Sequence, residues 1–299
     1  MQVDPFYVVN LSSALDQTQA SQQQLSEELS SGLRVTSIGD DPVAAAQNVQ
    51  LLNSIQQDDS FTQTSSITQG LMQVTDSTLG SVVTQLNQAI SLATQANNGT
   101  MNASDLTSIS GQIAGILDEV VSLANTDYQG QYIFGGSQTG TTPFTLDNST
   151  SPAMVTYNGD SDVNTLVTPA GQSIQLNLPG NQVFTSATAN VLGTLSNLVA
   201  DYASGSVGNG VTDTAALNSA LNYVSQQRVT IDNSLTQLND ASGVATEQAT
   251  QLTAVQTDLM QADIPSVSTQ LALVQSQQSA LISVIAALSQ GSLFDHLPS

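Results

Sequence analysis

The sequence predicts a mainly α-helical protein, an antiparallel helical rod or coiled coil that carries a small inserted β domain. Apolar residues recur at alternating spacings of three and four over most of both halves of the chain. The two chain ends match, because each has the pattern of a helix with one narrow apolar seam. Residues 131–186 differ and hold short β-favouring runs between clusters of Gly, Pro, Asn and Asp.

The N-terminal helix is predicted over residues 8–33. Gly32 supplies its end, since glycine enters the left-handed conformation that closes a helix without steric cost. Asp41 and Pro42 predict the start of a second helix, because Asp accepts the first free N–H groups and Pro suits the first helical position. The apolar seam of the first helix consists of Val8, Leu11, Leu15, Leu25 and Leu29.

Three further helices are predicted before the long C-terminal pattern. The first covers residues 43–98. The second begins at a cap formed by Ser104 or Asp105 and ends near Tyr128. The third covers residues 190–202 and is followed by a flexible loop.

The longest pattern begins at Leu217 and keeps a 4,3 alternation to Leu252, which predicts a long helix. Val255, Leu259 and Ala262 are predicted to continue this seam after one skipped residue. Pro265 then interrupts the periodicity, and a last helix resumes the same spacing. Its predicted seam consists of Val267, Leu271, Val274, Gln278, Leu281, Ile285 and Leu288.

The predicted β domain is too small for an independent core and is expected to lean on the helices. The strict alternation in "SIQLNLPG" places Ile174, Leu176 and Leu178 on one face of a strand. The whole chain is therefore predicted to divide into terminal assembly helices (1–36 and 264–299), a helical rod (37–134 and 187–263) and the β domain (135–186).

The terminal helices are predicted to be disordered in the monomer and to become ordered on assembly. A helix with one narrow apolar stripe is marginal alone, because forming its nucleus is costly and its seam stays wet. Pairing between the two ends helps, and neighbouring copies would complete the burial.

The net charge of −22 arises from 24 acidic residues against Arg34 and Arg228, with no lysine. This composition argues against nucleic-acid and anionic-membrane partners, because both are bound through cations. The absence of cysteine excludes disulfides and thiolate metal sites. The first residues lack a basic n-region, so we expect a cytosolic protein or one exported without a cleavable signal peptide.

The sequence predicts no enzyme, no cofactor and no metal site. A Ser nucleophile would need His296, the only histidine, which lies three residues from the last residue. The acidic residues within 158–164 are spaced as in a calcium-binding loop. Such a loop requires Gly and Glu at the positions where this sequence has Thr165 and Gly171, so a hairpin turn is favoured. The pair Asp40 and Asp41 is explained by helix capping.

The two arginines have different predicted roles. Arg34 lies near Asp40 and Asp41 and could hold a bent loop or dock a neighbouring copy through paired hydrogen bonds to carboxylates, and we favour docking. A solvated surface arginine is the alternative. Arg228 lies on the long seam. We favour packing of its aliphatic part along the helix with the guanidinium in water over an ion pair with a buried acidic residue.

Several stretches together resemble one family. "LSSGLRVTSIGDDPVAAAQ" is similar to the N-terminal signature of bacterial flagellins and their relatives. "YIFGGSQTGTTPF", "VTYNGD", "LPGNQVF" and the ending "SLFDHL" resemble the hook-filament junction members of that superfamily, although Leu33 in "SSGLR" is more typical of filament flagellin. The resemblance covers nearly the whole chain in the right order and implies a flagellin-like fold.

The resemblance implies a structural subunit of the bacterial flagellum that joins hook to filament as a mechanical adaptor. Implied partners are copies of itself in a ring, the other junction protein, flagellin and a cytosolic export chaperone, and the implied location is extracellular, reached by type III export. Filament flagellin and a secreted coiled-coil adhesin or effector are the alternatives. The expected assembly residues are Arg34, Asp40, Asp41, Pro42, Leu11, Leu15, Leu25, Leu29, Leu271, Val274, Leu281, Ile285, Leu288, Leu293 and Phe294.

Overall fold

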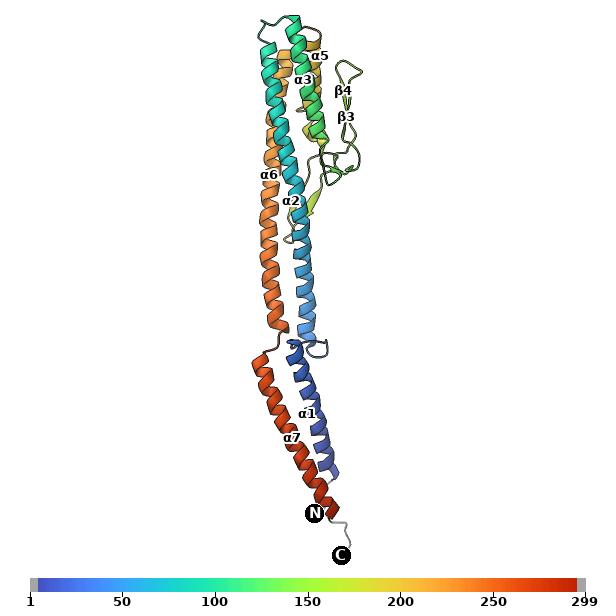
Figure 1. The fold of residues 1–299 in the computed structure, drawn as a ribbon, viewed down its shortest axis with the longest axis vertical. Coiled ribbons are helices and arrows are strands. Elements are labelled where there is room, and N and C mark those ends of the chain that lie inside the picture. Colours follow the sequence, from blue (N-terminus) through green and yellow to red (C-terminus); the bar gives the residue numbers. More distant parts are fainter. Residues whose placement is uncertain (1–4, 295–299) are drawn as a thin grey trace. The chain divides into compact units, whose positions relative to one another are not determined.

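A computed structural model describes residues 5–294 of the chain, with side chains described for residues 9–287. The chain forms two compact units, Gln57–Glu247 and the combination of Met1–Gln56 with Gln248–Ser299. Most of the described residues are helical (Figure 1). The helices are α1 (Pro5–Ser31), α2 (Pro42–Ala96), α3 (Ala103–Ala124), α4 (Gly180–Val183), α5 (Val191–Ala203), α6 (Gly210–Met260) and α7 (Ile264–Phe294). The fold class predicted from the sequence is confirmed.

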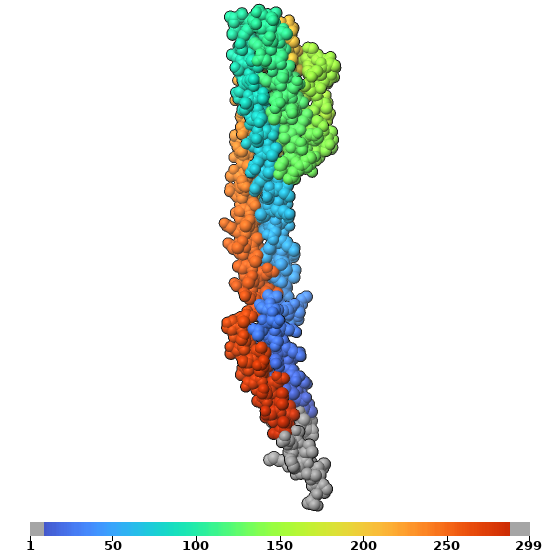
Figure 2. Space-filling model, viewed as in Figure 1, coloured from blue at the N-terminus to red at the C-terminus, as the bar shows by residue number. Residues whose placement is uncertain are grey.

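In the unit that contains both termini, α1 and α7 pack side by side, as the blue and red segments of Figure 2 show. Gly32 ends α1 with a φ of 71°, as predicted. The non-helical segments that follow α1 and α6 are hydrogen-bonded to each other. Arg34 N donates to Met260 O at 2.7 Å, and Ala262 N donates to Gly32 O at 2.9 Å. This short bridge fixes the two helix ends side by side.

In the other unit, the cap of α3 differs from the prediction. Asn102, rather than Ser104 or Asp105, is the N-cap residue, and Asp105 completes a capping box as its third helical residue. The helix ends at Ala124, short of the predicted Tyr128. The reason is Asn125, whose side-chain amide exchanges two hydrogen bonds with the backbone of Phe144. The chain leaves the helix to make this contact.

The strands form three two-stranded antiparallel sheets. They are β1 (Asp127–Tyr128) with β2 (Gln131–Tyr132), β3 (Phe144–Asp147) with β4 (Met154–Tyr157), and β5 (Thr165–Val167) with β6 (Ser173–Gln175). Figure 1 shows the β3–β4 pair beside α3 and α5.

Two strand predictions were wrong. Residues 158–164 are not a hairpin turn, because β4 and β5 lie in different sheets. The strand predicted through "SIQLNLPG" ends at Gln175. Beyond it Leu176 N still donates to Asn164 O at 2.9 Å, and the Asn177 side chain then bonds to the backbone of Asn164 and Asp162 in place of further ladder bonds.

Three of the stretches that carry the resemblance converge in one aromatic cluster. Phe134, Phe144 and Phe184 meet edge to face, with ring centroids 5.0 Å apart for Phe134 and Phe184 and 5.4 Å apart for Phe144 and Phe184. The Tyr157 hydroxyl donates to the carbonyl oxygen of Phe134 at 2.9 Å. The cluster is part of the same buried core as the helices, so the β segments and the helices share one core.

The long seam of α6 is confirmed in its first part, since Leu217, Val224, Ile231 and Leu238 are fully buried. The helix begins at Gly210, earlier than the pattern suggests. Val255 was wrongly placed on the seam, because its side chain is exposed. The predicted division into terminal helices, rod and β domain stays a prediction, because the two compact units of the chain have different boundaries.

Candidate assembly site

The loop between α1 and α2 is held by two adjacent carboxylates that act differently. Asp41 is the predicted N-cap of α2, and its Oδ1 accepts from the backbone N–H groups of Val43 at 3.1 Å and Ala44 at 3.0 Å. Pro42 occupies the first helical position. The bond from Ala44 and then the Arg34 guanidinium lower the pKa of Asp41 below its usual value.

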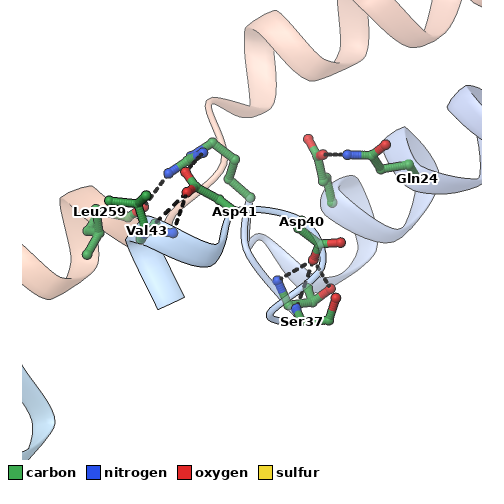
Figure 3. Close-up of polar contacts among 10 residues, drawn as sticks. Gln24, Ser37, Asp40, Asp41, Val43 and Leu259 are labelled. Carbon is green, nitrogen blue, oxygen red and sulfur yellow. Dashed lines mark hydrogen bonds and ion pairs between the residues drawn. The ribbon is translucent and has the colours of Figure 1, made fainter. Parts of the chain in front are cut away.

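Asp40 does not cap the helix, which corrects the reading of both aspartates as helix caps. Its Oδ2 accepts from the backbone N–H groups of Ser37 at 2.8 Å and Thr36 at 3.0 Å, and from the Thr36 hydroxyl (Figure 3). These bonds close a tight turn over residues 36–40. The N–H of Ser37, followed by that of Thr36, lowers the pKa of Asp40.

Arg34 joins this loop to the end of α6. Its Nη1 lies 3.1 Å from Asp41 Oδ2, and its Nη2 donates to the carbonyl oxygen of Leu259 at 3.1 Å (Figure 3). The second bond satisfies a free carbonyl of the last helical turn, where a positive charge also favours the helix dipole. The guanidinium therefore holds the bent loop within its own chain. The Arg34 side chain is 46% exposed, so part of it still faces solvent.

Most of the predicted seam residues of α1 and α7 with described side chains are at least partly covered. Leu11 is buried, and Leu15, Leu25, Leu271, Val274, Leu281 and Ile285 are half-buried. Leu29 is exposed. Leu288, Leu293 and Phe294 lie in α7 beyond the described side chains, as Val8 does in α1, and His296 lies outside the described residues.

A second apolar set on the terminal helices was missed by the sequence reasoning. Large apolar side chains remain exposed on α1 and α7, namely Val9, Leu273, Ile282 and Val284. The signal that could have found them is charge, because the sequence of α7 contains no ionisable residue in a chain of net charge −22. An uncharged helix with apolar groups on several sides is typical of a helix buried on several sides.

The α1–α7 pair also leaves an open groove of about 560 Å³ between the helices. Its walls are Ala14, Gln17, Thr18, Ser21, Val274, Gln277, Ala280, Leu281 and Val284. Three of the four α1 residues are small, namely Ala14, Thr18 and Ser21, so the larger α7 side chains are only partly covered. Apolar surface left in this groove favours contact with another molecule.

In the other unit, Arg228 corrects a prediction. Its guanidinium is not free in water but forms an ion pair with Asp76 of α2. The hydrogen bonding of the Arg228 guanidinium to Asp76 raises the pKa of Arg228 above its usual value. Gly80 lies one turn beyond Asp76, and a Cβ built there would stand 3.4 Å from the guanidinium carbon. The missing side chain gives the arginine room between the helices.

Within the described residues, no group of three or more His, Asp or Glu side chains could hold a metal ion. A search of the helices over that same range finds none long and apolar enough to cross a membrane.

Two curated proteins are similar to the chain over much of its length. Flagellar hook-associated protein 3 of Salmonella typhimurium is 32% identical over 181 residues, which are 60% of this chain and 55% of that protein. Flagellar hook-associated protein 3 of Escherichia coli is 31% identical over 176 residues, which are 58% of this chain and 54% of that protein. The chain thus matches about half the length of each relative.

The fold is shared with a solved structure described as a putative flagellar hook-associated protein from Vibrio parahaemolyticus. The TM-score is 0.64 at 20% identity, over 74% of this chain and all of that one. The shared fold consists of long paired helices with a small β insertion. Residues 7–139 match the bacterial flagellin N-terminal helical region. This match places the similarity to bacterial flagellins in the N-terminal half of the chain.

Proposed function

We propose that this chain is a structural subunit of the bacterial flagellum, acting at the junction between hook and filament. The observation that carries the proposal is its similarity to two hook-associated proteins over more than half of the chain. Its role there is mechanical, adapting the hook to the filament through helices shared among neighbouring copies. Filament flagellin is the nearest alternative.

The terminal helices are the proposed assembly surface, comprising the predicted seam residues and the exposed set Val9, Leu273, Ile282 and Val284. Copies of a chain with net charge −22 repel one another, but the repulsion is screened beyond about 8 Å at physiological salt. Surfaces without charge can pack in close contact without the electrostatic repulsion that remains at short range. The sequence of α7 supplies such a surface, because it has no ionisable residue.

Arg34 has a positioning role in this proposal. By holding the loop against the end of α6, it fixes where α1 ends and α2 begins. Its remaining exposed donors are available to a carboxylate of a neighbouring copy, since a guanidinium carries five N–H groups.

The proposed partners are further copies in a ring, the other junction protein, flagellin and a cytosolic export chaperone. The proposed location is extracellular, on the bacterial flagellum. The proposed role requires no catalysis.

The test is to label detached flagella with gold-tagged antibody against residues 135–186 and to locate the grains by electron microscopy. A narrow band at the hook-filament boundary is the expected result. Grains along the whole filament would make the chain a flagellin instead, and their absence from flagella would leave the secreted adhesin or effector.

A further inference from the structure

The buried face of α2 contains two polar side-chain atoms that lack hydrogen-bond partners among the described residues. Asp58 is 1% exposed and Ser65 is fully buried. No described group bonds to Asp58 Oδ2 or to Ser65 Oγ. The buried Thr68 and Thr75 nearby differ, because each donates its hydroxyl to the carbonyl four residues earlier.

The charges around Asp58 offer it no compensation. Asp59, the next residue, is exposed and also acidic. The helix packed against this part of α2 is α6, whose register is given by the pair Arg228 and Asp76. Counting the same number of residues along both antiparallel helices places Asp58 level with residue 246. The nearest charged residues of α6 there are Asp240 and Glu247, both acidic and exposed.

The two cations of the chain are committed elsewhere, Arg34 to Asp41 and Arg228 to Asp76. Ionising a buried carboxyl without a partner is costly, because the charge loses its hydration. Burial, together with the neighbouring Asp59 charge, raises the pKa of Asp58.

We propose that Asp58 makes the packing of α2 against α6 sensitive to pH. The two helices pack tightly around Asp58 when its carboxyl is protonated, and they separate locally when the carboxyl is ionised. The compliant stretch is the turn of α2 that follows Asp58 and the level of α6 near Ala245. Both lie within the Gln57–Glu247 unit, and their opening does not depend on the flagellar role.

The direction of the pH effect follows from the raised pKa of Asp58. Closure is complete when the pH lies below the ordinary value of 3.8 and is progressively lost as the pH rises through the folded-state pKa. The penalty is fully present once the pH exceeds the folded-state pKa. An uncharged replacement therefore gains most at neutral pH and little in acid.

The test compares Asp58→Asn with Asp59→Asn, which removes the same charge one residue away on the exposed side. Hydrogen exchange of the amides flanking residue 58 would be measured at pH 7 and at pH 3. For Asp58→Asn we expect exchange at pH 7 to slow about tenfold for each unit by which the pKa is raised, after correction for intrinsic rates, with little change at pH 3. For Asp59→Asn we expect little change at either pH.

A slowing of equal size at both pH values, or faster exchange at pH 7, would overturn the proposal. Because an asparagine amide must also find partners in this site, the wild-type chain supplies a second measurement. The side-chain carboxyl carbon of Asp58 should titrate by NMR at a pH above the ordinary value of 3.8. A titration midpoint at or below 3.8 would also overturn the proposal.

Discussion

Arg228 on α6 binds Asp76 on α2 through two parallel hydrogen bonds, with Nε 2.9 Å from Oδ1 and Nη2 3.0 Å from Oδ2. The planar guanidinium matches the carboxylate, and Gly80 leaves space for it. Of the two cations in the sequence, this one is used to join two helices whose partnered residues are 152 positions apart. The ion pair fixes which faces of α2 and α6 pack against each other at this level of the core.

Replacing Asp76 by Asn should therefore destabilise the protein. Hydrogen bonds to charged groups contribute about 1.5–3 kcal/mol. Because both side chains are partly exposed, we expect a smaller loss of about 1–2 kcal/mol in the free energy of unfolding. Urea denaturation would measure it. The double variant Asp76→Asn with Arg228→Gln should recover part of the loss, since no unpaired guanidinium remains. A double variant less stable than the sum of the single losses would contradict the pairing.

Charge reversal at Arg34 should abolish assembly while the helices persist. In Arg34→Glu, a carboxylate would face Asp41 and the carbonyl of Leu259, so the loop would be repelled from both of its anchors. Helicity would be followed by circular dichroism and assembly by sedimentation. Arg34→Gln, which keeps a donor but no charge, should give an intermediate yield. Normal assembly of Arg34→Glu would remove the positioning role.

A methyl group at Gly180 should disrupt the aromatic cluster. A Cβ there would stand 2.7 Å from Cε2 of Phe144 and 2.9 Å from the carbonyl oxygen of Phe134. Overpacking of this kind costs about 1–3 kcal/mol, so Gly180→Ala should lower the unfolding free energy by that amount. Gly115→Ala on α3, where nothing lies within 4 Å of the added Cβ, is the matched control. It should stabilise the helix by about 0.5–1 kcal/mol.

Acid should loosen the loop held by Asp40 and Asp41. Their pKa values are lowered in the folded chain, so the contribution of their bonds is present above pH 3.8 and is lost as the pH falls through the folded-state values. Amide exchange at Ser37 and Ala44 should accelerate below that pH, relative to intrinsic rates. The amide of Gly193 is capped by the neutral side chain of Asn190 and should show no such step. Equal behaviour at all three amides would rule out the carboxylate anchors.

The terminal helices should gain order on assembly. The α1–α7 seam is only half-covered and bounded by an open groove, so the pair gains little from pairing within the chain alone. Removing residues 1–31 and 264–299 should therefore leave the unfolding transition of the Gln57–Glu247 unit nearly unchanged while preventing assembly. Exchange of α1 and α7 amides in the free chain should be fast and should slow on assembly. Slow exchange in the free monomer would show that the helices are already stable.

The sequence predicted the helices well where the spacing of apolar residues alone decides them. The buried positions Leu217, Val224, Ile231 and Leu238 are the predicted seam, and Asp41 with Pro42 begins α2 as their chemistry requires. Predictions failed where side chains bond to distant backbone. Asn125 ends α3 by binding Phe144, a partner that no local pattern in the sequence could indicate.

For the candidate site, the sequence by itself determined which residues are unusual: two cations, adjacent aspartates, and an uncharged last helix. These are properties of composition and local spacing. Only the tertiary structure decided what they meet. Arg34 binds Asp41 and the carbonyl of Leu259, and Arg228 binds Asp76. Asp58 Oδ2 is buried without a partner among the described residues. The reason is that ion pairs and burial depend on the register between helices that are far apart in the chain. The periodic spacing of apolar residues, by contrast, is a property of each helical segment by itself.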